Sequence, residues 1–399
     1  MTQGHVVIVG AGLAGATTAR ALREGGWRGR VTLLGAEPHR PYDRPPLSKE
    51  LLLGQPAPLD LDIDFEALDI TLTPGRTATR LDAGERRLET DAGELRYDAL
   101  VLACGARAVR LPGTDGLARV WTLRTRDDAE RLRAVLDARG SLVIVGAGWI
   151  GAEVAGAARA AGCQVTVVEA GEHPLAGTLP AEVTAPMRAW YAQAGAELRT
   201  GRPVTAVRDG EVELADGTVL RGDAVLVGIG SRADTEWLAG SGVPLDPDGS
   251  VRADAALATG VPGVYAVGDC ASYPSARFGR RLAVHHWDNA LVGARTVAAT
   301  LLGERAGHDP VPYFWSTQFG RHLQFVGRPD AGDRPLWRGD PAADATWSVC
   351  WTRDDRLTAV LAVDRPRDLA QARRLIGRGV PVDPDRLVDP DVPLKAAVR

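Results

Sequence analysis

The chain of 399 residues contains one short motif twice, as VVIVGAGLAG at 6–15 and as LVIVGAGWIG at 142–151. In each copy an apolar run leads into Gly-x-Gly-x-x-Gly, and an alanine-rich segment follows. Such a run is too short for a helix and too apolar for an edge strand, so it predicts a buried parallel strand. The sequence therefore predicts an α/β fold with two Rossmann-like dinucleotide-binding domains.

Each glycine of the first copy has its own expected role. Gly10 allows a tight turn, Gly12 lets the backbone approach a pyrophosphate, and Gly15 lets the following helix lie close to the strand. A helix over 13–25 leads to a second strand at 31–34, and Glu37 follows that strand. A carboxylate at this spacing would accept hydrogen bonds from a ribose.

The second copy has the same context. Gly146, Gly148 and Gly151 precede a helix that ends at Ala161, and Glu169 ends the next strand. Because no arginine follows Glu169 closely, this carboxylate should bind a ribose 2′-hydroxyl and repel a 2′-phosphate, which favours NADH over NADPH. The alternative is that both turns serve packing alone and bind nothing.

Composition limits the other possible functions. The net charge of −4 argues against nucleic acid as a partner. The sequence has no apolar stretch of 18 residues and no room for a targeting peptide before its first strand, so we expect a cytoplasmic protein that is not inserted in a membrane. The cysteines are far apart and form no CxxC, so we expect no metal centre or redox dithiol, and each thiol should be a buried small hydrophobe: Cys104, Cys163, Cys270 and Cys350.

Lys49 is unusual because the chain has 47 basic residues and only two of them are lysines. It lies in the string PYDRPPLSKELLLG. A compact ammonium group suits a position where a single point charge must meet one atom, and arginine does not replace it there. The alternative is a lysine retained by chance at the surface.

A further carboxylate follows the apolar segment 264–267. Gly268 and Asp269 end this segment, which places Asp269 at the carboxyl end of a strand, where open α/β sheets bind ligands. Asp269 could instead be a helix N-cap, and both roles are compatible.

After Pro310 the sequence pattern changes. The segments YFWSTQFGRHLQFVG and WSVCWTRDDRLTAVLAV are rich in aromatic and β-branched residues, and the second contains a turn at Asp354 and Asp355. A helix is expected at about 367–378. These elements predict a small α+β domain.

These motifs together resemble the FAD-dependent, NADH-dependent ferredoxin reductases, the putidaredoxin reductase-like components of P450 and aromatic dioxygenase systems. The resemblance covers essentially the whole chain. It rests on both glycine motifs, the PYDRPPLSK string, LVLACGAR at 100–107, the VYAVGD segment, HHWDNA at 285–290 and YFWS at 313–316. It implies a glutathione reductase-like fold, with an FAD-binding domain at 1–110 and 236–310, an NADH-binding domain at 111–235 and a C-terminal interface domain at 311–399.

The resemblance also implies site residues. Lys49 would lie beside the flavin N5 with Glu153 as its ion-pair partner, and Trp287 and Trp315 would lie near the flavin ring, although core packing is the alternative for both tryptophans. The implied FAD contacts are Gly10, Gly12, Ala14, Gly15, Glu37, Arg44, Lys49, Ala78, Arg107, Arg124, Gly268, Asp269 and Trp287. The implied NAD contacts are Gly146, Gly148, Ile150, Gly151, Glu169 and Gly230.

The expected reaction follows from these cofactors and from Ser48. Oxidase-type relatives carry a cysteine near this position, so here the electrons should leave directly from the flavin to a one-electron carrier such as a [2Fe–2S] ferredoxin, which serves a P450 or another oxygenase. The protein would be a monomer or homodimer. The alternatives are an NADH-dependent flavoenzyme that reduces oxygen or a small molecule, and a redox-sensing protein that resembles apoptosis-inducing factor. Five arginines could steer an acidic ferredoxin or simply be solvated: Arg277, Arg280, Arg281, Arg295 and Arg321.

Three positions depart from the family pattern. Cys104 replaces the usual threonine and Ala233 the usual proline, and both are expected to be packing changes. His285 stands where relatives carry glutamate, so we expect a group that titrates near neutrality and affects the flavin potential or the choice of acceptor.

Overall fold

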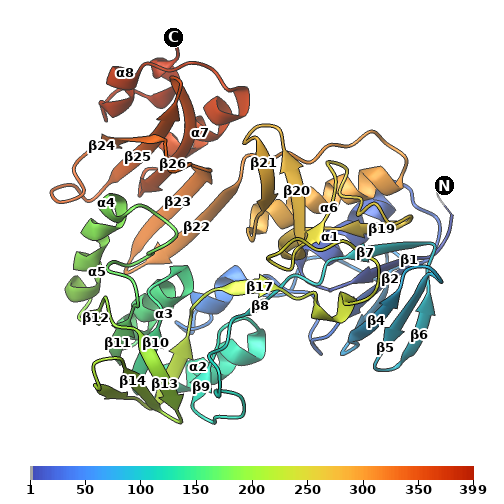
Figure 1. Cartoon of the computed structure of the whole chain (residues 1–399), viewed down its shortest axis with the longest axis horizontal. Coiled ribbons are helices and arrows are strands. Elements are labelled where there is room, and N and C mark those ends of the chain that lie inside the picture. Colours follow the sequence, from blue (N-terminus) through green and yellow to red (C-terminus); the bar gives the residue numbers. More distant parts are fainter. Residues whose placement is uncertain (1–2) are drawn as a thin grey trace. The chain divides into compact units, whose positions relative to one another are not determined.

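The computed structural model describes residues 3–399 and divides into two compact units (Figure 1). Each unit is described by itself. Unit 1 contains the residues up to Asp43, Pro58–Arg107 and Arg232–Pro312, and unit 2 contains Arg44–Ala57, Ala108–Ser231 and Tyr313–Arg399. The chain passes from one unit to the other five times, and two of these passages lie within β8 (Ala106–Ala108) and β17 (Ser231–Ala233).

Unit 1 is built on a five-stranded parallel sheet with β1 at its centre. The three inner strands of the sheet are mostly apolar and wholly buried, and α1 (Leu13–Glu24) packs beside α6 (Trp287–Leu301) over it. The sequence-predicted strand 6–9 and the helix after it are confirmed. The strand order is β19 (Val264–Ala266), β7 (Ala99–Leu102), β1 (Val6–Val9), β2 (Val31–Gly35) and β3 (Thr71–Pro74).

Two small three-stranded sheets complete unit 1. The first is antiparallel and contains β4 (Ala78–Asp82), β5 (Arg87–Thr90) and β6 (Gly93–Arg96). The second contains β18 (Val251–Arg252), β20 (Ala271–Ser275) and β21 (Arg280–Ala283). Short 3-10 turns lie at η3 (Glu236–Leu238) and η4 (Gly268–Cys270).

Unit 2 repeats the first architecture around the second motif. Its parallel sheet has β10 at the centre, and α3 (Trp149–Ala160) follows that strand. A capping box between Thr125 and Asp128 begins α2 (Arg126–Asp137). The strand order is β12 (Glu197–Arg199), β11 (Gln164–Val168), β10 (Ser141–Val145), β16 (Ala224–Val227) and β9 (Val120–Trp121). Smaller elements are η1 (Pro45–Ser48), α4 (Ala181–Thr184), η2 (Ala185–Met187), α5 (Arg188–Gln193), β13 (Val204–Arg208), β14 (Glu211–Leu214) and β15 (Val219–Arg221).

The C-terminal part of unit 2 is an antiparallel sheet covered by α7 (Pro366–Arg378). The turn predicted at Asp354 and Asp355 is confirmed, and both residues have positive φ angles, 48° and 56°. The strand order is β22 (Tyr313–Gln318), β23 (Arg321–Gly327), β26 (Arg356–Val363), β25 (Trp347–Arg353) and β24 (Arg334–Arg338). The short elements α8 (Pro384–Val388) and η5 (Leu394–Ala397) end the chain.

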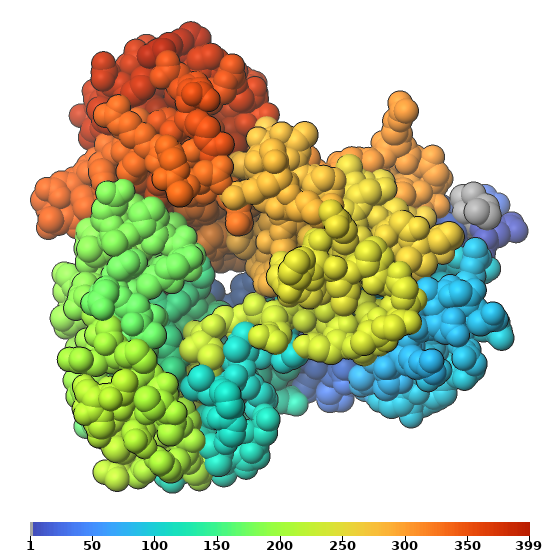
Figure 2. All heavy atoms as spheres, in the orientation of Figure 1, coloured from blue at the N-terminus to red at the C-terminus, as the bar shows by residue number. Residues whose placement is uncertain are grey.

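This C-terminal sheet shares a hydrophobic core with the helices α4 and α5. Leu179, Val183 and Trp190 from the helical side pack with Trp347 and Leu361 from the sheet. Figure 2 shows the green helical segment lying directly against the orange-to-red domain. The C-terminal sheet and the second nucleotide fold are therefore parts of one packed body.

Candidate functional site

The first glycine turn lies directly after the central strand of its sheet. A Cβ atom on Gly10 would lie 2.1 Å from the Ala103 carbonyl oxygen, and one on Gly15 would lie 1.9 Å from the Gly10 carbonyl oxygen. No atom lies within 4 Å of the same position on Gly12. The turn is therefore closed by backbone at its outer glycines and open at Gly12, as a backbone that must approach a phosphate requires.

Gly268 and Asp269 lie close to this turn. A Cβ atom on Gly268 would lie 2.9 Å from the Ala14 Cβ, so the segment after β19 runs against the start of α1. Asp269 is inside the turn η4, whose N-cap position belongs to Val267. The alternative interpretation of Asp269 as a helix N-cap is therefore wrong.

Glu37 follows β2 of the five-stranded sheet, and Ala78 follows β3 of that sheet. Tyr42 Oη donates a 2.5 Å hydrogen bond to Glu37 Oε2, and the Gly75 amide donates to the Glu37 carbonyl oxygen at 2.9 Å. Ala78 begins β4 three residues later. The acid predicted to bind a ribose is thus held at the rim of the first nucleotide fold.

Trp287 and Arg107 also belong to unit 1. Trp287 begins α6, and its indole nitrogen donates to Asp43 Oδ1 at 2.8 Å. Arg107 is exposed and forms an ion pair with Glu236. Both side chains have protein partners, and their expected contacts with FAD stay predictions.

The second glycine turn has the same form as the first. Cβ atoms on Gly146 and Gly151 would lie 2.5 and 2.0 Å from backbone carbonyl oxygens, whereas the nearest atom to one on Gly148 would be 3.8 Å away. Ile150 and Ile229 flank this opening and are 39% and 38% exposed. An open turn bordered by exposed apolar side chains suits a bound nucleotide.

Glu169 reaches the second turn from the end of β11. Its carboxylate accepts 2.8 Å hydrogen bonds from the amides of Ala147 and Gly171. These bonds fix the carboxylate beside the turn, and each of its oxygens retains a second lone pair for a ribose hydroxyl.

Lys49 and Glu153 form an ion pair within unit 2. Lys49 follows η1, Glu153 lies on α3, and Lys49 Nζ is 2.8 Å from Glu153 Oε2. The Ser48 hydroxyl donates to the same carboxylate oxygen. The predicted pairing is thus present in the structure. The alternative of a chance surface lysine does not fit, because its side chain is only 14% exposed.

Ser316 and Thr317 complete the surroundings of Glu153, and sequence reasoning missed both. Ser316 Oγ donates to Glu153 Oε1 at 2.7 Å, and the Thr317 amide donates to the same oxygen at 3.3 Å. The spacing along the chain, more than 160 residues, gave no indication of this contact.

The predicted site residues are divided between the two units. Arg44 and Arg124 lie in unit 2, where Arg44 Nη1 donates to the Arg124 carbonyl oxygen. Unit 1 holds Gly10, Gly12, Ala14, Gly15, Glu37, Ala78, Arg107, Gly268, Asp269 and Trp287, and unit 2 holds Arg44, Lys49, Arg124, Gly146, Gly148, Ile150, Gly151, Glu153, Glu169 and Gly230.

One of the four cysteines differs from expectation. Cys163, Cys270 and Cys350 are buried, whereas Cys104 is only partly buried. The neighbouring Cys270 thiol and burial raise the pKa of Cys104. Cys270 Sγ also donates to the Leu102 carbonyl oxygen at 3.3 Å. The expectation of a buried small hydrophobe is thus confirmed for Cys163, Cys270 and Cys350 and is only partly met by Cys104, which lies near Cys270 at the ends of neighbouring strands.

Arg281 and Arg321 are not part of a solvated arginine surface. Arg281 pairs with Asp246 Oδ2 at 3.3 Å and donates to two backbone carbonyls, while Arg321 lies over the Trp190 ring at 5.0 Å. His285 is exposed. Burial opposes the ionised form of Asp248, but hydrogen bonds from Ser250 outweigh it and lower the pKa of Asp248, and the nearby His285 adds to this lowering.

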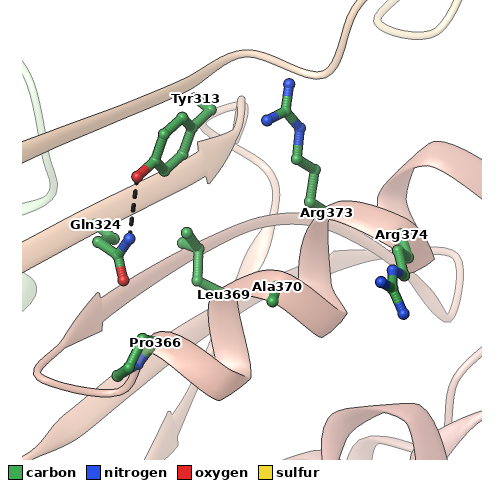
Figure 3. Close-up of a pocket in the computed structure, with 7 residues that line it drawn as sticks. All are labelled: Tyr313, Gln324, Pro366, Leu369, Ala370, Arg373 and Arg374. Atoms are coloured by element: carbon green, nitrogen blue, oxygen red, sulfur yellow. Dashed lines mark hydrogen bonds between the residues drawn. The ribbon is translucent and has the colours of Figure 1, made fainter. Parts of the chain in front are cut away.

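A groove of about 520 Å³ lies on the C-terminal domain, apart from the glycine turns (Figure 3). Tyr313 Oη accepts a 3.0 Å hydrogen bond from Gln324 Nε2, and the Arg373 guanidinium lies 5.6 Å from the Tyr313 ring centre. The lining residues are Tyr313, Gln324, Pro366, Leu369, Ala370, Arg373 and Arg374.

Within residues 3–399 no helix is long and apolar enough to cross a membrane. The same part of the chain contains no group of three or more His, Cys, Asp or Glu side chains placed to hold a metal ion.

The two open glycine turns define the class of protein. Each follows the central strand of a five-stranded parallel sheet, the point at which such sheets bind nucleotides, and the second has the Glu169 carboxylate beside it. The residues present therefore fit two dinucleotides. A family model described as "Pyridine nucleotide-disulphide oxidoreductase" matches residues 4–293, and one described as "Reductase C-terminal" matches residues 313–398. The chain belongs to the pyridine nucleotide-disulphide oxidoreductase family and carries that C-terminal domain.

Similar proteins match over nearly the whole chain. The ferredoxin–NAD(+) reductase component of the p-cumate 2,3-dioxygenase system of Pseudomonas putida is 39% identical, with 98% of this chain and 97% of that protein covered. Rhodocoxin reductase of Rhodococcus erythropolis is 37% identical, with 98% and 94% covered. The crystal structure of the covalent putidaredoxin reductase–putidaredoxin complex matches with a TM-score of 0.94 at 34% identity and covers 98% of this chain and 97% of that one.

Proposed function

We propose that the protein is an NADH-dependent ferredoxin reductase that supplies electrons to a P450 or another oxygenase. The observation that carries this proposal is the pair of open glycine turns, the second of which is hydrogen-bonded to the Glu169 carboxylate. Two dinucleotide sites in one chain suit electron transfer between an exchangeable nicotinamide and a resident flavin. The family resemblance and the relatives' names support the same activity.

The first turn would hold FAD and the second NADH. Gly12 would admit the FAD pyrophosphate, with Glu37 on a ribose and Asp269 on the ribityl chain, and Gly148 and Glu169 would do the same for NADH. When bound, FAD would supply the redox chemistry, taking up a hydride from NADH and passing the two electrons singly to two ferredoxins. The chain's own task is to bind and orient the cofactors.

The Lys49–Glu153 pair would supply a fixed positive charge next to the flavin ring. A buried ion pair costs desolvation energy, so its retention favours a functional use. The hydroxyl of Ser48 is committed to Glu153 and has no thiol chemistry. Cys270 is fully buried and donates its thiol to the Leu102 carbonyl oxygen, so this thiol is not accessible to a disulfide substrate. Electrons would therefore leave the flavin directly to a protein carrier.

The proposal is tested by measuring NADH and NADPH oxidation with two acceptors. Ferricyanide needs no docking, whereas a [2Fe–2S] ferredoxin does. We expect both acceptors to be reduced, with a kcat/KM for NADH at least about 100-fold above that for NADPH, because Glu169 repels a 2′-phosphate. Glu169→Gln should lower the ratio of kcat/KM for NADH to kcat/KM for NADPH.

Two outcomes would contradict the proposal. Comparable kcat/KM values for NADH and NADPH would contradict the proposed role of Glu169 in repelling the 2′-phosphate. Rapid reoxidation of the NADH-reduced protein by air, without ferredoxin turnover, would favour the oxidase alternative. The three-domain limits, the cytoplasmic location and the monomer or homodimer state stay predictions.

A further inference from the structure

Glu153 is a buried carboxylate that receives four hydrogen-bond donors. The residue is 5% exposed, and the donors come from two sides: Ser48 and Lys49 serve Oε2, while Ser316 and the Thr317 amide serve Oε1. Each carboxylate oxygen has two lone-pair sites, so both oxygens are filled. Residues from η1 and β22 are thus joined through one side chain of α3.

The direction of the Ser316 hydroxyl is fixed by its own neighbour. Gln318 Nε2 donates to Ser316 Oγ at 3.2 Å, so the serine oxygen accepts from Gln318 and its proton points to Glu153 Oε1. Ser316 and Gln318 are 1% and 2% exposed and lie on the same face of β22 because side chains alternate along a strand. Thr317 is exposed on the opposite face.

Gly156 allows the strand to come this close to the helix. It lies one turn after Glu153 on α3, and a Cβ atom there would be 2.9 Å from the Phe319 amide nitrogen at the end of β22. A larger residue would push the strand away from the helix and lengthen the Ser316–Glu153 bond. The approach that delivers the hydroxyl therefore depends on a glycine.

We propose that Ser316 is a positioning residue for the Lys49–Glu153 pair. By holding Oε1 of Glu153, Ser316 keeps Oε2 directed at the Lys49 ammonium, so a strand of the C-terminal domain sets the position of the lysine. Gln318 and Gly156 support this function. The inference rests on the role proposed above for Lys49 in flavin reduction.

The test is stopped-flow reduction of the FAD-loaded protein by NADH. Ser316→Ala should slow flavin reduction at saturating NADH about tenfold, because misplaced groups near a reacting centre cost rate steeply, and should leave the Kd for NADH within twofold. Gln318→Leu removes the amide that orients the Ser316 hydroxyl, so this variant should slow flavin reduction by a smaller factor. Thr317→Val is the matched control because its backbone amide still donates to Glu153. It should change neither the rate of flavin reduction nor the Kd for NADH.

A double-mutant cycle separates positioning from general damage to the fold. Lys49→Met should slow flavin reduction, and adding Ser316→Ala to it should change the rate by less than twofold, because Ser316 acts through Lys49. Independent, multiplicative effects would overturn the inference, as would a Ser316→Ala rate equal to wild type. FAD content and the thermal midpoint of each variant show whether it is folded. Ferredoxin turnover by the wild-type protein tests the proposed function separately, so a failure of that function is distinct from a failure of the positioning role.

Discussion

His308 is held in a buried site where a neutral imidazole is favoured. It is 2% exposed, its Nε2 lies 2.9 Å from Asn289 Oδ1, and its ring meets the Tyr273 ring edge-on with centres 4.4 Å apart. An amide oxygen only accepts, so Nε2 carries the proton of the neutral ring. Burial lowers the pKa of His308 to about 4 from its usual 6.5.

This shift predicts that acid destabilises the protein well above pH 4. Between pH 6.5 and 4 the unfolded chain binds a proton at His308 that the folded chain does not. His308 therefore leaves the free energy of unfolding unchanged above pH 6.5 and lowers it as the pH falls below that value. The free energy of unfolding should be about 2 kcal/mol lower at pH 5 than at pH 7 from this group alone. Urea unfolding at both pH values measures it. His308→Gln should remove that part of the pH dependence, and an unchanged slope in the variant would contradict this account.

The glycine turns lead to a prediction at the scale of a single element. Gly12→Ala should leave the free energy of unfolding within about 1 kcal/mol, since the added Cβ meets no atom within 4 Å, but the methyl group should block the phosphate and abolish FAD retention. Gly15→Ala should instead destabilise the fold by about 1–3 kcal/mol through overpacking. Flavin absorbance per protein and denaturant unfolding measure the two effects.

Gly148→Ala is the matched control for Gly12→Ala in the other turn. Its Cβ would also fit, with the nearest atom 3.8 Å away. It should raise the KM for NADH and leave the FAD content at the wild-type value. Loss of FAD from the Gly148 variant, or full FAD content in the Gly12 variant, would show that the turns are assigned to the wrong nucleotides.

Local elements were predictable because their determinants are local. The strands around Val7 and Val143 and the turn at Asp354 each depend on a few neighbouring residues, and the structure confirms them. The contacts of Glu153 with Ser316 and of Cys104 with Cys270 join residues more than 160 positions apart. Such contacts depend on how strands and helices pack, which spacing along the chain does not encode.

At the scale of the whole molecule, the segment Arg44–Ala57 packs with unit 2. There Arg133 Nη1 donates to the Leu51 carbonyl oxygen at 2.9 Å, and Lys49 meets Glu153. The domain limits expected from the resemblance stay predictions. The sequence gives no composition change at Arg44, so only tertiary contacts reveal this division.

The shared core of unit 2 predicts that the second nucleotide fold needs the C-terminal domain. Removing residues 313–399 would expose Val183, Met187 and Trp190, which are at most 5% exposed in the full chain, and an apolar patch of this kind drives aggregation. We expect a chain of residues 1–312 to be insoluble, and co-expression of residues 313–399 to restore solubility. A soluble, cooperatively unfolding short chain would contradict this expectation, and light scattering with thermal unfolding distinguishes the outcomes.

The four donors around Glu153 also limit how proteins of this kind can be recombined. A chimera that took its C-terminal domain from a relative would keep the ion pair of Lys49 and Glu153 but could lose the hydroxyl at 316, the amide side chain at 318 or the close approach at Gly156. Engineers who exchange this domain to change the redox partner should therefore transfer the residues at 316 and 318 together with helix α3, which carries Glu153 and Gly156.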